Sequence, residues 1–99
     1  MSLSRTIIIN YLKEHKQDFM QKYSIDKLAL FGSFATDNNT DESDVDIAYQ
    51  TSSKGLTFSQ LSQLEDELYR IFGTNIDLVN FKYMNPLIKR KAIKDMIYV

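Results

Sequence analysis

The stretch FGSFATDNNTDESDVDIAY, residues 31–49, sets a Gly-Ser pair ahead of two aspartates that interrupt an apolar run. The apolar residues 27–31 before Gly32 predict a short buried strand that the glycine ends. Residues 36–43, which are rich in Asp, Asn and Thr, predict a loop. Residues 44–50 alternate between polar and apolar side chains, which predicts a second strand with one chemically unusual face.

The alternation sorts this second strand into two sets of side chains. Val45, Ile47 and Tyr49 share one face, and Asp44, Asp46 and Ala48 share the other. The two carboxylates would lie roughly 6–7 Å apart at the backbone and would repel each other unless a cation joined them. Hard oxygen ligands of this kind suit Mg²⁺ or Mn²⁺. We expect a divalent-metal site here, and the alternative is a half-exposed strand with two solvated aspartates.

The rest of the chain predicts three helices and a third strand. Apolar residues at helical spacing predict a helix over 4–22, with His15 as a packed residue beside its apolar stripe, and a second helix from Thr57 to Gly73. Residues 75–81 alternate and carry Asp77. Asn85 and Pro86 predict the start of a last helix that continues to about residue 96.

The order of these elements, α, β, loop, β, α, β, α, fits a single domain over residues 1–99. We therefore expect a two-layer α/β or α+β fold, in which a small mixed sheet has its helices packed on one side. Within this fold, the apolar stripe of the second helix is predicted to be Phe58, Leu61, Leu64, Leu68, Ile71 and Phe72.

Composition excludes several classes of function. The formal charge of −1 gives no global attraction for nucleic acid or anionic membranes, and the absence of cysteine excludes disulfides and thiolate chemistry. The chain has no apolar run long enough for a signal peptide or a membrane span, so we expect a cytoplasmic protein. Five acids fall within residues 37–46 and five bases within 82–94. These clusters are either solvated faces or joint receptors for a cation and a phosphate.

Gly32-Ser33, ten intervening residues and Asp44-Val45-Asp46 together match the pattern G-S-x(10)-D-x-D. In this motif the chain resembles the DNA polymerase beta-like nucleotidyltransferase superfamily, and its length resembles the minimal nucleotidyltransferases, or MNT domains. The resemblance implies that Gly32 and Ser33 hold the β- and γ-phosphates of a nucleoside triphosphate. It also implies that Asp44 and Asp46 hold two Mg²⁺ ions, for which Mn²⁺ is an alternative. Asp77 would complete the metal site and help to deprotonate the attacking hydroxyl.

The chain departs from this family pattern at Thr36-Asp37, where many relatives carry Arg-Gly. The change removes a possible phosphate contact and adds a negative charge near the expected triphosphate site. This departure puts nucleotide affinity in question more than metal binding. The candidates to supply the missing positive charge are Lys89, Arg90, Lys91 and Lys94.

The resemblance implies a Mg²⁺-dependent transfer of a nucleoside monophosphate, with AMP from ATP expected, to a hydroxyl group. Minimal members commonly pair with a helical HEPN toxin and act as its antitoxin by attaching AMP to a toxin tyrosine, so a HEPN-type partner protein is expected. One alternative is an antitoxin that binds without catalysis. Another is transfer to a small molecule such as an aminoglycoside, which needs an acceptor pocket built, for example, by homo-oligomerisation. Nucleic-acid binding is disfavoured because no stacking platform is evident.

Overall fold

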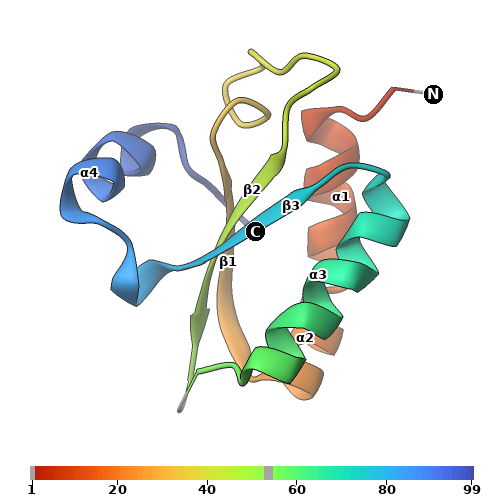
Figure 1. The fold of residues 1–99 in the computed structure, drawn as a ribbon, viewed down its shortest axis with the longest axis vertical. Helices are drawn as coiled ribbons and strands as arrows, with labels where there is room; N and C mark the ends of the chain where they lie inside the picture. The colour runs from red at the N-terminus through yellow and green to blue at the C-terminus, as the bar shows by residue number, and fades with distance from the viewer. Residues whose placement is uncertain (1, 53–54) are drawn as a thin grey trace.

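The protein is a mixed four-stranded sheet covered by helices (Figure 1). The computed structural model describes residues 2–52 and 55–99. Strands β1 (Ile25–Phe31), β2 (Val45–Thr51), β3 (Ile76–Asn80) and β4 (Ile97–Tyr98) lie in the order β3-β2-β1-β4. β1 runs antiparallel to β2 and β4, whereas β2 and β3 are parallel. The predicted α+β class with a mixed sheet is therefore confirmed.

The first predicted helix forms as two consecutive helices, α1 (Arg5–Glu14) and α2 (Lys16–Tyr23). Ser4 caps α1, since its hydroxyl accepts a hydrogen bond from the Ile7 amide. The chain turns at His15. The centre of the His15 ring lies 4.2 Å from the centre of the Tyr11 ring, and its Nδ1 lies 3.3 Å from a carboxylate oxygen of Asp18. The amide of His15 still donates to the Tyr11 carbonyl. The apolar stripe continues across the break, because Leu12 of α1 and Phe19 of α2 are both buried.

Helix α3 (Phe58–Phe72) has the predicted limits. A capping box between Thr57 and Gln60 starts the helix, and Gly73 ends it in a left-handed conformation. Leu64, Leu68 and Phe72 are buried against the sheet. The predicted apolar stripe is too wide, however, because Phe58 is 86% and Ile71 is 53% exposed. Both lie outside the narrower line of contact that a helix makes with a sheet.

The last helix, α4 (Pro86–Asp95), lies on the other face of the sheet (Figure 1), so the prediction that the helices pack on one side is wrong. Asn85 caps it and Pro86 is its first residue, as predicted. The 3₁₀ turn η1 (Phe81–Tyr83) brings the chain across from β3. Small side chains allow this approach: Ala29 and Ala48 on the sheet pack with Met84 and with the partly buried Ala92 and Met96.

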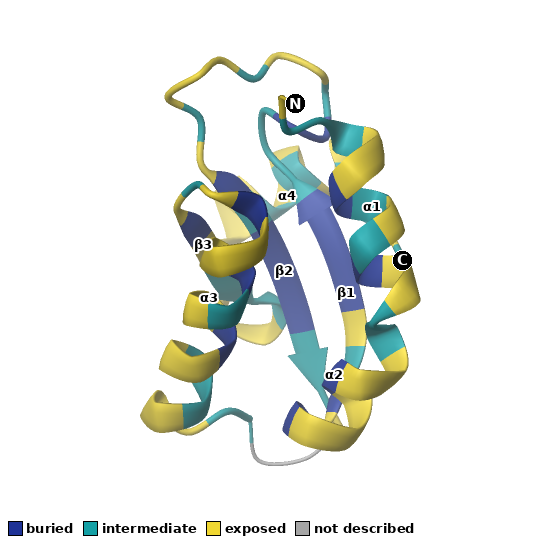
Figure 2. Cartoon of the chain, turned by 90° about the vertical axis from the view of Figure 1, so that its right-hand side faces the viewer, coloured by how far each residue is buried: buried dark blue, intermediate teal, exposed yellow. Residues whose placement is uncertain are grey.

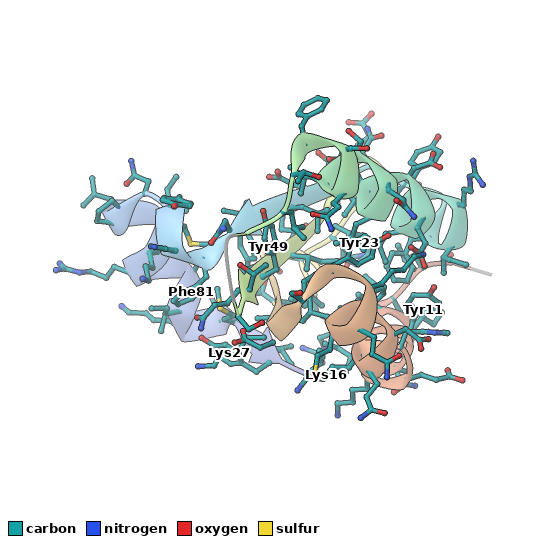
Figure 3. The ribbon with its side chains drawn as sticks, turned by 90° about the horizontal axis from the view of Figure 1, so that it is seen from below. Tyr11, Lys16, Tyr23, Lys27, Tyr49 and Phe81 are labelled. Atoms are coloured by element: carbon teal, nitrogen blue, oxygen red, sulfur yellow. The ribbon has the colours of Figure 1, made fainter. Side chains whose placement is uncertain are left out.

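The core lies mainly between the sheet and helices α1 to α3 (Figure 2). Leu28, Leu30, Val45, Ile47 and Tyr49 of the sheet face these helices, which contribute among others Ile8, Leu12, Phe19, Leu64 and Leu68. Figure 3 shows Tyr11 and Tyr23 on the side of α1 and α2, with Phe81 on the side of α4. Because both faces are covered, consecutive residues of β1 are buried.

Strand β4 was not expected from the sequence. It consists of Ile97 and Tyr98, which pair with Leu30 and Ala29, and the Val99 amide donates to the Leu28 carbonyl. Two residues are too few for an alternation to be detected. None of the helices in the described residues combines the length and apolar character needed to cross a membrane.

We expect Leu68→Ala to lower the free energy of unfolding by about 2–5 kcal/mol, because Leu68 is 1% exposed and its loss leaves a cavity. Ile71→Ala on the same helix should lower it by about 0.5 kcal/mol or less. Urea denaturation of the two variants measures the difference. Equal losses would contradict the packing of α3 described above.

Candidate active site

Three aspartates meet near one end of the sheet. The parallel register of β2 and β3 places Asp46 directly opposite Asp77. On its other side, Asp46 is opposite Phe31, the residue before Gly32. Asp44 is exposed and stands one residue before β2. The sheet topology thus brings together carboxylates that the sequence separates by more than thirty residues.

Gly32 lies against the side chain of Asp46. A Cβ atom at position 32 would be 2.9 Å from the Asp46 Cγ and closer still to Oδ2, nearer than real Cβ atoms approach other groups. The φ angle of Gly32 is also +75°, a conformation that residues with a Cβ rarely adopt. Glycine is therefore required here both by the backbone and by the position of the Asp46 carboxylate.

The chain after Gly32 forms a helical turn. The amides of Ala35 and Thr36 donate to the Gly32 carbonyl at 3.1 and 3.3 Å, and the Asn38 amide donates to the Ser33 carbonyl at 2.9 Å. These bonds do not use the amides of Ser33 and Phe34, which lie at the start of the turn. Such amides are the groups that phosphates bind at the start of helical turns.

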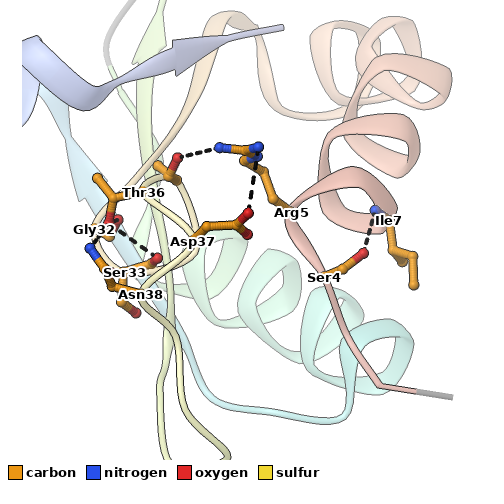
Figure 4. A network of polar contacts seen from close by, with 9 residues as sticks. Ser4, Arg5, Ile7, Gly32, Ser33, Thr36, Asp37 and Asn38 are labelled. Carbon is orange, nitrogen blue, oxygen red and sulfur yellow. Dashed lines mark hydrogen bonds and ion pairs between the residues drawn. The ribbon is translucent and has the colours of Figure 1, made fainter.

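The structure explains how Thr36-Asp37 is accommodated (Figure 4). Asp37 has a φ of +62°, which an aspartate tolerates better than most residues with a side chain. Arg5, at the start of α1, places Nη2 3.6 Å from the Asp37 carboxylate, and its Nη1 donates to the Ala35 carbonyl at 3.2 Å. Arg5 therefore counters the charge that Asp37 adds and ties the turn to α1.

A second set of hydrogen bonds fixes the start of β2. The Ser43 hydroxyl accepts from the Thr40 amide at 2.8 Å, which closes the end of the loop. Thr74 donates its hydroxyl hydrogen to the Ser43 carbonyl at 3.1 Å, and the Val45 amide donates to the Asn75 carbonyl at 2.9 Å. These bonds hold the residues beside Asp44 against the segment that leads into β3.

The sequence did not single out Arg5 or Thr74. Arg5 acts on a turn about thirty residues away, and Thr74 acts on a carbonyl 31 residues away. Neither residue lies in a motif. Their contacts become visible only in the folded chain, where Arg5 reaches the turn after Gly32 and Thr74 reaches the end of the loop before β2.

Burial and neighbouring negative charge act together on Asp46. Burial is the largest cause, followed by the charges of Asp77 and Asp44, and together they raise the pKa of Asp46 from 3.8 to about 6. A raised pKa of this origin means that the ionised cluster is under mutual repulsion, which a cation would relieve.

The donor set fits a divalent cation, because all three aspartates offer hard carboxylate oxygens. Within residues 2–52 and 55–99, no three His, Cys, Asp or Glu side chains already converge as a complete metal-binding group. Asp46 and Asp77, paired in register, are the pair on which a cation site would be built.

The four basic residues of α4 occupy different surroundings. Lys91 lines a cleft of about 310 Å³ together with Gly32 and Thr36. Lys89 instead holds its Nζ 4.2 Å from the centre of the Phe81 ring. Arg90 and Lys94 are exposed and do not line this cleft. Of the candidates raised by the sequence, Lys91 is therefore the one that the fold brings to the Gly32 turn.

Comparison with known proteins identifies the class. The family model described as polymerase beta, nucleotidyltransferase matches residues 8–99, so the chain belongs to this family and is a nucleotidyltransferase. It also matches curated relatives over about nine tenths of their own length. One such relative, "Putative protein adenylyltransferase MJ1379" of Methanocaldococcus jannaschii, is 37% identical over 89% of this chain and 90% of its own length.

Solved structures confirm the fold. One described as "Structure of putative minimal nucleotidyltransferase" superposes with a TM-score of 0.77 at 17% identity, over 96% of this chain and 95% of that chain. Another, described as a tri-AMPylated Shewanella oneidensis HEPN toxin in complex with MNT antitoxin, gives a TM-score of 0.67 at 18% identity. It covers 95% of this chain and 70% of the matched chain.

We expect Gly32→Ala to abolish nucleotidyl transfer, because the added methyl group must displace the Asp46 carboxylate. Gly73→Ala is the matched control: Gly73 has a φ of +71°, but an added Cβ there meets no atom within 4 Å. Both variants should lose about 1–2 kcal/mol of stability from the backbone alone. Transfer assays and thermal unfolding separate the two effects. An active Gly32→Ala protein would show that the contact with Asp46 is not needed.

The raised pKa of Asp46 predicts a pH-dependent stability of the metal-free protein. The folded state binds this proton more tightly than the unfolded state, so the contribution of Asp46 to stability falls as pH rises from about 4 through about 6. Asp46→Asn lacks this ionisation, and its stability relative to the wild type should rise between about pH 4.5 and about pH 7. Denaturation in the presence of a chelator at both pH values measures it. A difference that does not change with pH contradicts the clustered-charge account.

Proposed function

We propose that this chain is a Mg²⁺-dependent protein adenylyltransferase, which transfers AMP from ATP to a hydroxyl group on a partner protein. The observation that carries the proposal is the position of Asp46, between Gly32 of the turn and Asp77 of β3. This arrangement sets a phosphate-binding turn directly beside a cluster of carboxylates. Nucleotidyl transfer requires both.

Each residue has a role in the proposed reaction. The turn that begins at Gly32 and Ser33 receives the β- and γ-phosphates through its amides and the Ser33 hydroxyl. Asp44, Asp46 and Asp77 hold Mg²⁺, with Mn²⁺ as an alternative. When bound, the metal ions neutralise the phosphate charge and lower the pKa of the attacking hydroxyl.

The covalent step exchanges the α–β phosphoanhydride bond of ATP for a phosphate ester bond to the acceptor. The acceptor oxygen bonds to the α-phosphorus of ATP, and the bond from that phosphorus to the oxygen bridging to the β-phosphate breaks. Pyrophosphate leaves with the electron pair of the broken bond. The exposed carboxylate of Asp77 takes the proton from the acceptor hydroxyl, and Asp46, which is partly buried, holds its position between Gly32 and Asp77 throughout.

A protein acceptor is supported by the exposure of the site. Asp44 and Asp77 are exposed, so a side chain presented by another molecule can reach them without opening the fold. The similar structure described as an AMPylated HEPN toxin with its MNT antitoxin supports a helical HEPN-type partner. The relative described as a protein adenylyltransferase supports ATP as the nucleotide.

A purely binding role is less well supported. The departure at Thr36-Asp37 favours an antitoxin without catalysis, but Arg5 counters the charge that Asp37 adds beside the turn. An inactive binder also gains nothing from a cluster of carboxylates that raises the pKa of Asp46.

The test is transfer of labelled AMP from ATP to the protein encoded beside this one, in the presence of Mg²⁺. We expect label on the neighbour with the wild type and a loss of at least about 100-fold with Asp46→Asn, because Mg²⁺ loses a central ligand. Asp41→Asn is the control, since Asp41 is an exposed acid in the loop before β2 and lies outside the cluster.

Label transferred equally by the wild type and Asp46→Asn contradicts the assignment of the site. No label from the wild type, together with no binding of MgATP in calorimetry, contradicts the proposed activity itself.

A further inference from the structure

We propose that Lys91 of α4 contacts the β- and γ-phosphates of ATP and stabilises the pyrophosphate that leaves. This inference rests on the proposed function, since it concerns the same site. The juxtaposition that carries it is the cleft of about 310 Å³ in which Lys91 faces Gly32 and Thr36.

The cleft lies between one face of α4 and the end of β1. Its residues on α4 follow helical spacing and so share one face of the helix: Ile88, Lys91, Ala92 and Asp95. Phe31, Gly32 and Thr36 form the opposite wall. Gly32 is also the residue that Asp46 packs against. The cleft and the carboxylate cluster therefore both border Gly32.

The fold fixes the position of this part of α4. Ala92, the residue after Lys91, packs with Met96 against the Ala29 and Ala48 side of the sheet. The chain then enters β4, which pairs with β1. α4 is thus held at both its sheet-facing side and its C-terminal end, so Lys91 is presented to the turn by a structured element rather than by a loop.

The basic side chain that binds the turn is already engaged, because Arg5 contacts the Ala35 carbonyl and the Asp37 carboxylate. Lys89 points elsewhere and lies over the Phe81 ring. The ion pairs among the described residues involve the basic side chains of Arg5, His15, Lys22 and Arg70. Lys91 takes part in none of them, although Asp95 lines the same cleft. Its ammonium group remains available for a ligand.

A cation is needed at this place. A triphosphate bound at Gly32 lies beside Asp46, which packs against Gly32 and pairs in register with Asp77. As the bond between the α-phosphorus and the bridging oxygen breaks, negative charge grows on the pyrophosphate. A lysine ammonium is a compact charge with three hydrogen-bond donors and is well suited to receive it.

The experiment compares Lys91→Met with Lys94→Met in the otherwise intact protein. Both substitutions remove one lysine charge from α4 and keep an apolar stem, but Lys94 does not line the cleft. The probes are a non-hydrolysable ATP analogue with Mg²⁺, measured by calorimetry, and inorganic pyrophosphate, measured by displacement of that analogue. Lys91→Met should weaken both by about tenfold or more, the usual loss for a hydrogen bond to a charged group.

Lys91→Arg should retain most of the affinity, because it keeps the charge at the same place. Thermal unfolding serves as the check on folding, and since Lys91 is exposed we expect its variants to unfold at the wild-type temperature. If Lys91→Met binds both probes as tightly as Lys94→Met does, the inference is wrong while the proposed function stands. If the wild type itself binds neither probe, the proposed function fails and the inference fails with it.

Discussion

The close contact between the Asp46 carboxylate and Gly32 is the constraint on which the site depends. Asp46 can occupy this place only because residue 32 has no Cβ, and the parallel pairing of β2 and β3 sets Asp77 on its other side. The result is a partly buried acid whose pKa rises to about 6. Folding thus assembles repelling charges, and such an arrangement is favourable when a cation and a phosphate are bound beside it.

The remainder of the fold holds this end of the sheet in place. The apolar faces of α1, α2 and α3 bury the opposite side chains of β1 and β2, which anchors the strands that carry the aspartates. Side chains remote in sequence then secure the loops: Arg5 binds the turn after Gly32, and Thr74 binds the segment before Asp44. On the other face, α4 brings Lys91 to the same turn.

Much of this could be predicted from the sequence, because the relevant signals are local. The alternation around Asp46 predicts a strand, and the glycine after an apolar run predicts the turn. The caps at Asn85 and Gly73 predict where two helices begin and end. The break at His15 and the short strand β4 left no periodic signal. The contacts of Arg5 and Thr74 depend on tertiary packing, which no single segment encodes. The same is true of the position of Lys91, which differs from those of its basic neighbours on α4.

The central claim is that Asp44, Asp46 and Asp77 form one divalent-metal site beside Gly32. Substoichiometric Mn²⁺, added to isotope-labelled protein with a non-hydrolysable ATP analogue, tests it most directly, because the paramagnetic ion broadens only the NMR signals of nearby groups. The account predicts that the amide signals of Gly32, Asp46 and Asp77 broaden first, and that excess Mg²⁺ restores them. Broadening centred elsewhere in the chain, or none at these residues, would contradict it.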